Sequence, residues 1–185
     1  MIVAALYVDK RGPYFGLLGS EFCWDVDRDA RTYAGPWPVV AHPACGPWGK
    51  LRHMYKGGEG GPELAIKAVE QVRQWGGVLE HPAHSRLWAH CGLPRPDDLT
   101  DGYGGYTVAI NQCDWGHPCR KPTWLYCVRV EREIAEWQPP PREPTHWIGG
   151  GQCVPPGIKV ASERMRKVTP TWLADYLIFL AGTAS

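Results

Sequence analysis

The sequence predicts an α/β fold with a mostly parallel sheet, helices on both faces and an antiparallel hairpin near its end. Residues 39–45 and 77–82 are short apolar runs followed by Pro, Gly and polar residues, as is typical where a parallel strand leaves the core. Between them, residues 62–75 repeat apolar side chains at helical spacing, which predicts a strand, a crossover helix and a second strand. The apolar runs 106–112 and 123–130 are joined by a short link, so they should pair antiparallel.

The other elements follow from local patterns along the chain. Residues 2–8 are continuously apolar and are predicted as the first, central strand. Residues 10–19 carry three glycines but no helical pattern close behind them, which favours a surface loop. Residues 85–92 are expected to form a short helix, and the Pro- and Gly-rich residues 138–157 a surface loop. A Thr-Pro pair followed by apolar residues on one helical face predicts a C-terminal helix over about 170–181.

Composition limits the class of protein. A length of 185 residues suits a single domain over 1–185, and a net charge of +1 gives no overall attraction to nucleic acid or membrane. Seven cysteines at scattered spacings, with no signal peptide or long apolar span, favour a cytoplasmic protein without a membrane partner. Most of the ten tryptophans are expected in the core, with Trp48 and Trp115 as exceptions because their neighbours are loop formers.

Two reactive side chains follow neighbouring strands of the predicted sheet. Cys45 and Glu80 stand at the carboxyl ends of parallel strands, where open α/β sheets bind ligands, so both should face one cleft. A thiol beside a carboxylate can act as a nucleophile with a proton donor or hydrogen-bond partner. A buried structural cysteine and a solvated glutamate are the alternative interpretation of the same pattern.

A metal site is considered and not predicted. Cys113, His117 and Cys119 are close in sequence, but structural zinc sites usually draw their ligands as tight Cys-x-x-Cys pairs, and this chain has none. Their spacing fits neither a zinc ribbon nor a zinc finger.

Three segments, in order, resemble the catalytic half of the DNA cytosine-5 methyltransferases, and above all their small phage-encoded relatives. The segments are Pro43-Ala44-Cys45, Glu80-His81-Pro82 and Gln112 followed by the basic pair Arg120-Lys121. The resemblance implies a Rossmann-like, methyltransferase-like domain in which the Cys45 thiolate attacks C6 of cytosine and Glu80 contacts N3. Ala44 and His81 depart from the family pattern, in which a Pro precedes the Cys and an Asn follows the Glu.

The resemblance also implies ligands. S-adenosylmethionine would be the cofactor, with Asp9, Gly12 and Gly16 as its weakly indicated contacts. The substrate would be DNA or a pyrimidine nucleotide in the cytoplasm of a phage-infected bacterium. Basic residues would contact phosphate and the two exceptional tryptophans would stack on bases. The expected substrate-binding residues are His42, Trp48, Lys50, Arg52, His81, Ser85, Gln112, Trp115, Arg120 and Lys121.

A second hypothesis needs no catalysis. The shortened amino-terminal region and the two departures from the family pattern would suit a phage binding protein on a degenerate methyltransferase scaffold. Such a protein would capture a nucleotide or a host defence factor. The sequence leaves both hypotheses open, together with a third in which a metal-dependent protein is built on Cys113, His117 and Cys119.

Overall fold

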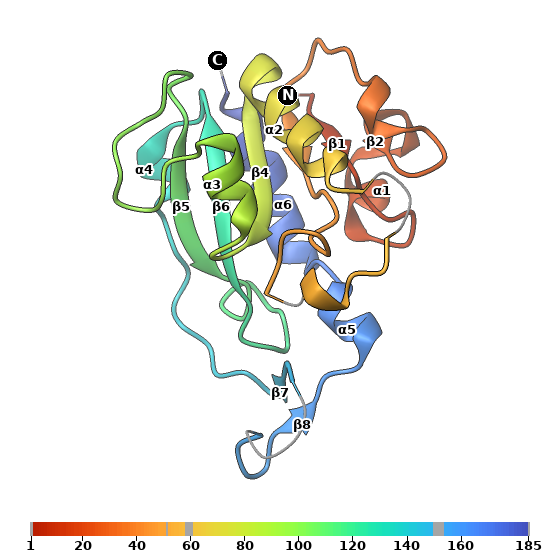
Figure 1. The fold of residues 1–185 in the computed structure, drawn as a ribbon, viewed down its shortest axis with the longest axis vertical. Coiled ribbons are helices and arrows are strands. Elements are labelled where there is room, and N and C mark those ends of the chain that lie inside the picture. The colour runs from red at the N-terminus through yellow and green to blue at the C-terminus, as the bar shows by residue number, and fades with distance from the viewer. Residues whose placement is uncertain (1, 51, 58–60, 150–153, 185) are drawn as a thin grey trace.

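The computed structural model describes residues 2–50, 52–57, 61–149 and 154–184, and it centres on one six-stranded sheet (Figure 1). The strand order across this sheet is β2-β1-β3-β4-β6-β5. Its strands are β1 (Ala4–Leu6), β2 (Cys23–Trp24), β3 (Val39–Ala41), β4 (Gly77–Pro82), β5 (Tyr106–Asn111) and β6 (Pro122–Val128).

The sheet confirms the expected mixture of strand directions. Strands β2, β1, β3 and β4 pair parallel with one another, whereas β6 pairs antiparallel with both β4 and β5. The predicted strand, crossover helix and strand are β3, α2 (Glu63–Trp75) and β4. Strand β1 is fully buried but lies next to the edge strand β2, so it is less central than predicted.

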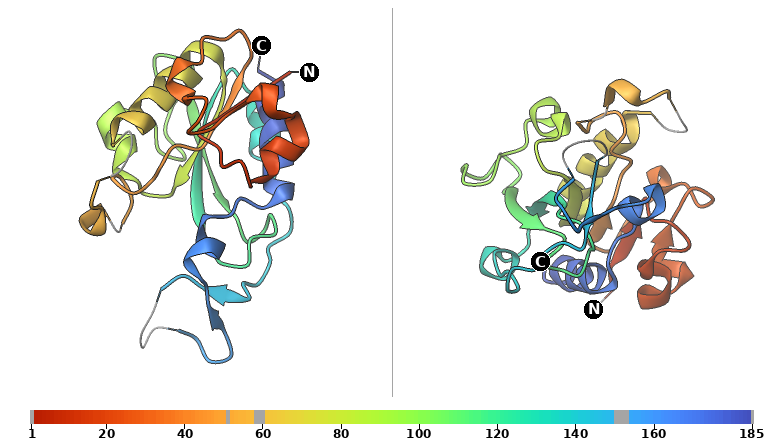
Figure 2. Two further views of the ribbon diagram at one scale, coloured as in Figure 1. Left: turned by 90° about the vertical axis from the view of Figure 1, so that its right-hand side faces the viewer. Right: turned by 90° about the horizontal axis from the view of Figure 1, so that it is seen from below.

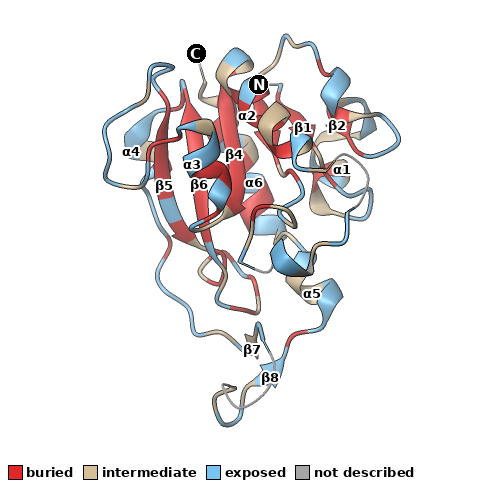
Figure 3. Ribbon diagram, in the orientation of Figure 1, coloured by how far each residue is buried: buried red, intermediate tan, exposed pale blue. Residues whose placement is uncertain are grey.

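Helices cover both faces of the sheet (Figure 2). On one face lie α2 and α3 (Arg86–Cys91), and on the other lie α1 (Pro13–Leu18), α4 (Arg132–Ala135) and α6 (Thr171–Gly182). Successive strand residues alternate between two apolar clusters, so Val78 packs towards α6 while Leu79 packs towards α2. The strands are accordingly the most deeply buried part of the chain (Figure 3).

Two elements differ from the prediction for the amino-terminal region. Helix α1 forms where residues 10–19 were expected to be a loop, and β2 follows it as a short edge strand. Pro13 suits the first helical turn because its missing N–H has no helical partner there, and Tyr14 anchors the helix by burying its ring. Six helical residues and two strand residues are too few to produce a clear period in the sequence.

An arm projects beyond the carboxyl ends of the parallel strands (Figures 1 and 2). It contains β7 (His146–Trp147), paired parallel with β8 (Lys159–Val160), and then α5 (Glu163–Lys167). The expected surface loop over 138–157 therefore contains β7, and its residues 150–153 lie outside the described part of the chain. Short 3₁₀ helices complete the description at η1 (Ser20–Phe22), η2 (Ala30–Thr32) and η3 (Arg52–Met54).

None of the described helices combines the length and apolar character that crossing a bilayer requires.

The start of β4 depends on a glycine. Gly77 has a φ of +110°, and a Cβ at this position would lie 2.0 Å from the carbonyl oxygen of Val39 on the paired strand. We expect Gly77→Ala to lower the free energy of unfolding by more than about 2 kcal/mol, because it combines backbone strain with a backbone clash. Urea unfolding followed by circular dichroism measures this change.

Gly16→Ala is the matched control. Gly16 is an exposed residue of α1 with nothing within 4 Å of an added Cβ, so alanine should stabilise the protein by about 0.5–1 kcal/mol. Equal effects of the two substitutions would contradict the proposed constraint at Gly77.

Candidate active site

The exposed residue Cys45 sits in a tight turn just beyond β3. The carbonyl oxygen of Cys45 accepts hydrogen bonds from the backbone N–H groups of Trp48 (3.1 Å) and Gly49 (2.8 Å). The buried Pro43 and the strand before it fix one end of this turn. The thiol is therefore presented at the carboxyl edge of the sheet by a short, internally bonded turn.

The turn that carries Cys45 is fastened to the turn that follows β4. The carbonyl oxygen of Trp48 accepts hydrogen bonds from Arg86 N (3.1 Å) and Ser85 Oγ (3.4 Å) at the start of α3. Ser85 Oγ also caps that helix by accepting from Leu87 N. The structure thus brings the ends of β3 and β4 together, as the sequence predicts for a crossover between neighbouring parallel strands.

A buried hydrogen-bonded chain runs from Glu80 towards α1. Glu80 is only 8% exposed, and its Oε2 lies 2.9 Å from His42 Nδ1. A carboxylate can only accept, so Nδ1 donates to Glu80. Tyr14 Oη lies 2.5 Å from Nε2, the other ring nitrogen of His42. Burial and the charge of Glu80 raise the pKa of Tyr14 well above its ordinary value, so this hydroxyl keeps its proton at neutral pH.

The other oxygen of Glu80 is bound from the β5–β6 side. Gln112 Nε2 donates to Glu80 Oε1 (2.7 Å) and to Thr123 Oγ1 (3.0 Å). Burial opposes ionisation of Glu80, but the hydrogen bond from His42 and the positive charge of Lys121 outweigh it and lower the pKa to about 2. Glu80 is therefore ionised at neutral pH and has both oxygens occupied in this conformation.

The thiol of Cys45 is not activated by its surroundings. Burial of the sulfur atom and the negative charge of Glu80 raise the pKa of this thiol. The positive charges of Lys121 and Lys167 only partly offset that rise. At neutral pH the thiol form therefore predominates in this conformation.

His81 points to the opposite face of the sheet from Glu80, because it is the next residue of β4. It is fully buried beside Trp88 of α3, and neither ring nitrogen has a hydrogen-bond partner among the described residues. Burial lowers the pKa of His81 to about 4, so the ring is neutral near pH 7. The Glu80 network does not include it.

The sequence-predicted basic residues are dispersed around the same edge. Lys50, Arg52 and Arg120 are exposed, and Lys121 is partly exposed near Glu80 and His81. The basic helix α5 also approaches, because the carbonyl oxygen of Met165 lies 3.2 Å from His117 Nε2 in the β5–β6 link. This approach explains how Lys167 influences Cys45 from 122 residues away in sequence.

Trp115 does not lie on the ligand side. Its ring is fully buried and stacks on Tyr176 of α6, with centroids 4.0 Å apart. The expectation that it would stack on a base is therefore at odds with this conformation. Loop-forming neighbours suggested exposure, whereas the packing of α6 against the link places the ring in the core.

The three residues indicated for S-adenosylmethionine do not build a joint site. The Asp9 carboxylate accepts from Arg11 N (2.8 Å), Nε and Nη2, and a Cβ on Gly12 would meet the Asp9 carbonyl at 2.9 Å. Gly16 lies separately on the exposed side of α1. The glycines serve the turn and the helix, and binding of S-adenosylmethionine by these residues stays a prediction.

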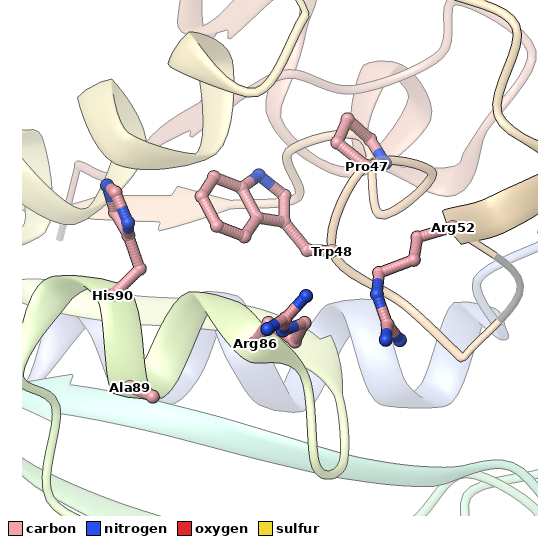
Figure 4. Close-up of a pocket in the computed structure, with 6 residues that line it drawn as sticks. All are labelled: Pro47, Trp48, Arg52, Arg86, Ala89 and His90. Carbon is pink, nitrogen blue, oxygen red and sulfur yellow. The ribbon is translucent and has the colours of Figure 1, made fainter.

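The sequence did not reveal a pocket on the α3 side of the Cys45 turn (Figure 4). This open pocket of about 410 Å³ is lined by Pro47, Trp48, Arg52, Arg86, Ala89 and His90. Trp48 and Arg52 were predicted as substrate contacts, whereas Arg86 and His90 were missed. Both residues belong to a short helix that follows a buried strand and begins after a serine cap. That pattern in the sequence could have indicated that Arg86 and His90 lie near the strand ends.

The described residues contain no group of three or more His, Cys, Asp or Glu side chains placed to hold a metal ion.

Comparison of the chain with protein-family models, with curated proteins and with solved structures finds no significant match.

The Glu80 network has a measurable pH signature. A pKa lowered from 4.5 to about 2 stabilises the fold above pH 4.5, and this stabilisation is lost as the pH falls towards 2. We expect Glu80→Gln to remove on the order of 3 kcal/mol at pH 6, and the difference from the unmodified protein to shrink between pH 4.5 and 2. Urea unfolding at a series of pH values measures it.

Glu70→Gln provides the comparison on α2. Glu70 makes an exposed ion pair with Lys67, which should contribute less than about 1 kcal/mol. A Glu80→Gln difference that stays constant from pH 6 to pH 2 would show that Glu80 is not held ionised by this network.

Proposed function

We propose that this protein is an enzyme that modifies a pyrimidine base, in a nucleotide or in nucleic acid, through a covalent bond from Cys45 Sγ. The observation that carries the proposal is the exposed thiol at the carboxyl edge of β3, fastened through Trp48 to the turn after β4. Glu80, Gln112 and Lys121, which belong to the segments that carry the resemblance to cytosine-5 methyltransferases, lie around the same edge and support the proposal.

A Rossmann-like, methyltransferase-like fold forms part of this proposal. The strand order reverses between β1 and β3, since the chain passes from β1 to β2 on one side and continues to β3 and β4 on the other. Ligands of open α/β sheets bind outside the carboxyl ends of the strands at such a switch point. Tyr14 and His42 meet at this position, and Cys45 follows shortly after His42.

The proposed reaction begins with addition to the base. The Cys45 thiolate forms a bond to C6, the electrons of the C5–C6 double bond move into the ring, and C5 becomes nucleophilic. When no methyl donor is present, C5 takes up a proton from the solvent. C5 then returns a proton to the solvent, and the Cys45 thiolate leaves C6, which restores the C5–C6 double bond of the base. Lys121 supplies positive charge near the developing anion, while Glu80 holds His42 and Gln112 in position.

The cytoplasm is the proposed setting for this chemistry. All six described cysteines are unpaired, as expected where thiols are kept reduced. The proposal of a phage-infected bacterial host rests only on the sequence resemblance.

Hydrogen exchange at C5 tests the reaction without any cofactor. We expect the protein in D₂O to introduce deuterium at C5 of cytosine, detected by mass spectrometry, in deoxycytidine monophosphate or in a single- or double-stranded oligonucleotide. Cys45→Ser should reduce the rate at least 100-fold while leaving the unfolding free energy nearly unchanged, because it removes the nucleophile from an exposed turn.

Cys91→Ser is the control, since Cys91 is a partly exposed thiol of α3 away from the strand ends. Exchange that survives in Cys45→Ser would eliminate the nucleophile assignment. No exchange with any of these substrates would eliminate the proposed reaction.

A second candidate function is ligand capture without catalysis on the same scaffold, with a nucleotide or a host defence factor as ligand. The observation that favours it is the raised pKa of Cys45, which leaves less thiolate at neutral pH. A higher pKa makes each thiolate more nucleophilic, but with a Brønsted slope of about 0.4–0.5 this gain does not offset the lost thiolate fraction.

The pH dependence of alkylation distinguishes an activated thiol from an inert one. We expect the reaction of Cys45 with iodoacetamide, followed by peptide mass spectrometry, to have a midpoint above the ordinary thiol pKa of about 8.5. A midpoint that falls below 7.5 when a pyrimidine nucleotide is added would favour the enzyme. A midpoint below 7.5 in the protein alone would contradict the raised pKa.

A further inference from the structure

We propose that the pocket between the Cys45 turn and α3 is a phosphate site for a nucleotide, with Arg52 and Arg86 as the phosphate ligands. The inference deepens the proposed function, and rests on it only for the identity of the ligand as a pyrimidine nucleotide. It assigns a binding role to Arg86 and His90, which lie outside the segments that carry the family resemblance.

The charges of the pocket favour an anion. Arg52, Arg86 and His90 are exposed and line the same pocket, with Trp48 between His90 and Arg52 (Figure 4). Among the described residues, no carboxylate lies within ion-pair distance of either arginine, and no lining residue is acidic. Two guanidinium groups with no ion-pair partner among the described residues suit a phosphate group, which accepts paired hydrogen bonds from arginine.

The aromatic wall is fixed before any ligand arrives. Trp48 Nε1 donates to the carbonyl oxygen of Pro62 (3.2 Å), which holds the mostly buried indole at the back of the pocket. The His90 ring lies 5.0 Å from it, tilted by 52°, and is itself exposed. A flat apolar wall beside a cationic rim suits a nucleotide, which combines a planar base with a phosphate.

The size and place of the pocket fit the same ligand. A volume of about 410 Å³ is too large for phosphate alone and lies within the range of about 300–1,000 Å³ found for small-molecule sites. Pro47 and Trp48 belong to the turn that presents Cys45, so the pocket adjoins the thiol along the chain. A phosphate held there would lie beside a base that reacts at the strand ends.

Isothermal titration with three probes tests the site: deoxycytidine, deoxycytidine monophosphate and inorganic phosphate. We expect the monophosphate to bind and the nucleoside to bind at least tenfold more weakly. Arg86→Gln and Arg52→Gln should each weaken monophosphate binding about tenfold or more and leave nucleoside binding unchanged, since each removes a charged hydrogen bond to phosphate. Saturable binding of phosphate itself would show that the anion alone suffices.

Arg95→Gln is the matched control, because Arg95 is an exposed arginine just beyond α3 that does not line the pocket. An equal loss in Arg95→Gln, or no loss in both pocket variants, would overturn the assignment, as would equal affinity for nucleoside and monophosphate. If Arg86→Gln fails to fold, Arg52→Gln and His90→Gln carry the test, because both alter exposed residues.

The outcomes separate the two proposals. Monophosphate binding that depends on Arg52 and Arg86, without C5 exchange, would refute the reaction and keep the phosphate site. C5 exchange that depends on Cys45, with monophosphate binding unaffected in the pocket variants, would refute the phosphate site and keep the reaction. The Cys45→Ser protein should bind the monophosphate as tightly as the unmodified protein, because Cys45 does not line the pocket.

Discussion

The arrangement of the site depends on one buried carboxylate. Glu80 accepts hydrogen bonds from His42 on one oxygen and from Gln112 on the other, so it joins β4 to the residues that follow β3 and β5. An ionised carboxylate is costly to bury unless its acceptors are satisfied, and these partners provide that compensation. The same charge orders the His42 tautomer and extends the network to Tyr14. It also opposes ionisation of the Cys45 thiol. The charge that holds His42 and Gln112 in place therefore makes this thiol less reactive.

Much of the fold follows from the sequence because its elements are long or strongly patterned. Helix α2 shows a clear helical period, and β5 and β6 are apolar runs whose short link requires a hairpin. The position of Cys45 beyond β3 was predictable from the end of an apolar run, whereas Glu80 was expected at a strand end and lies buried within β4. Helix α1 and strand β2 were not, since neither is long enough to show a period.

The remaining errors concern contacts between distant segments. Tyr14 enters the site only because α1 packs on the same face as His42, and 28 residues separate the two in sequence. The neighbours of Trp115 suggest an exposed loop, and only the docking of α6 encloses its ring. The pocket requires both the Cys45 turn and the first turn of α3, so no single segment predicts it. Side-chain identity indicated the chemistry, while tertiary packing decided which groups meet.

The carbonyl oxygen of Trp48 has a consequence for how the two parts of the site communicate. It accepts from Arg86 N, while the side chain of the same arginine faces the pocket and the chain leads back to Cys45 within three residues. A displacement of Arg86 is therefore transmitted to the thiol through one hydrogen bond and a short stretch of backbone. Any coupling along this path is reciprocal by thermodynamic linkage, so a ligand in the pocket and a group bound at the thiol would change each other's affinity by the same factor. The Trp48 peptide group is thus a direct hydrogen-bonded connection between the pocket and the turn that carries Cys45.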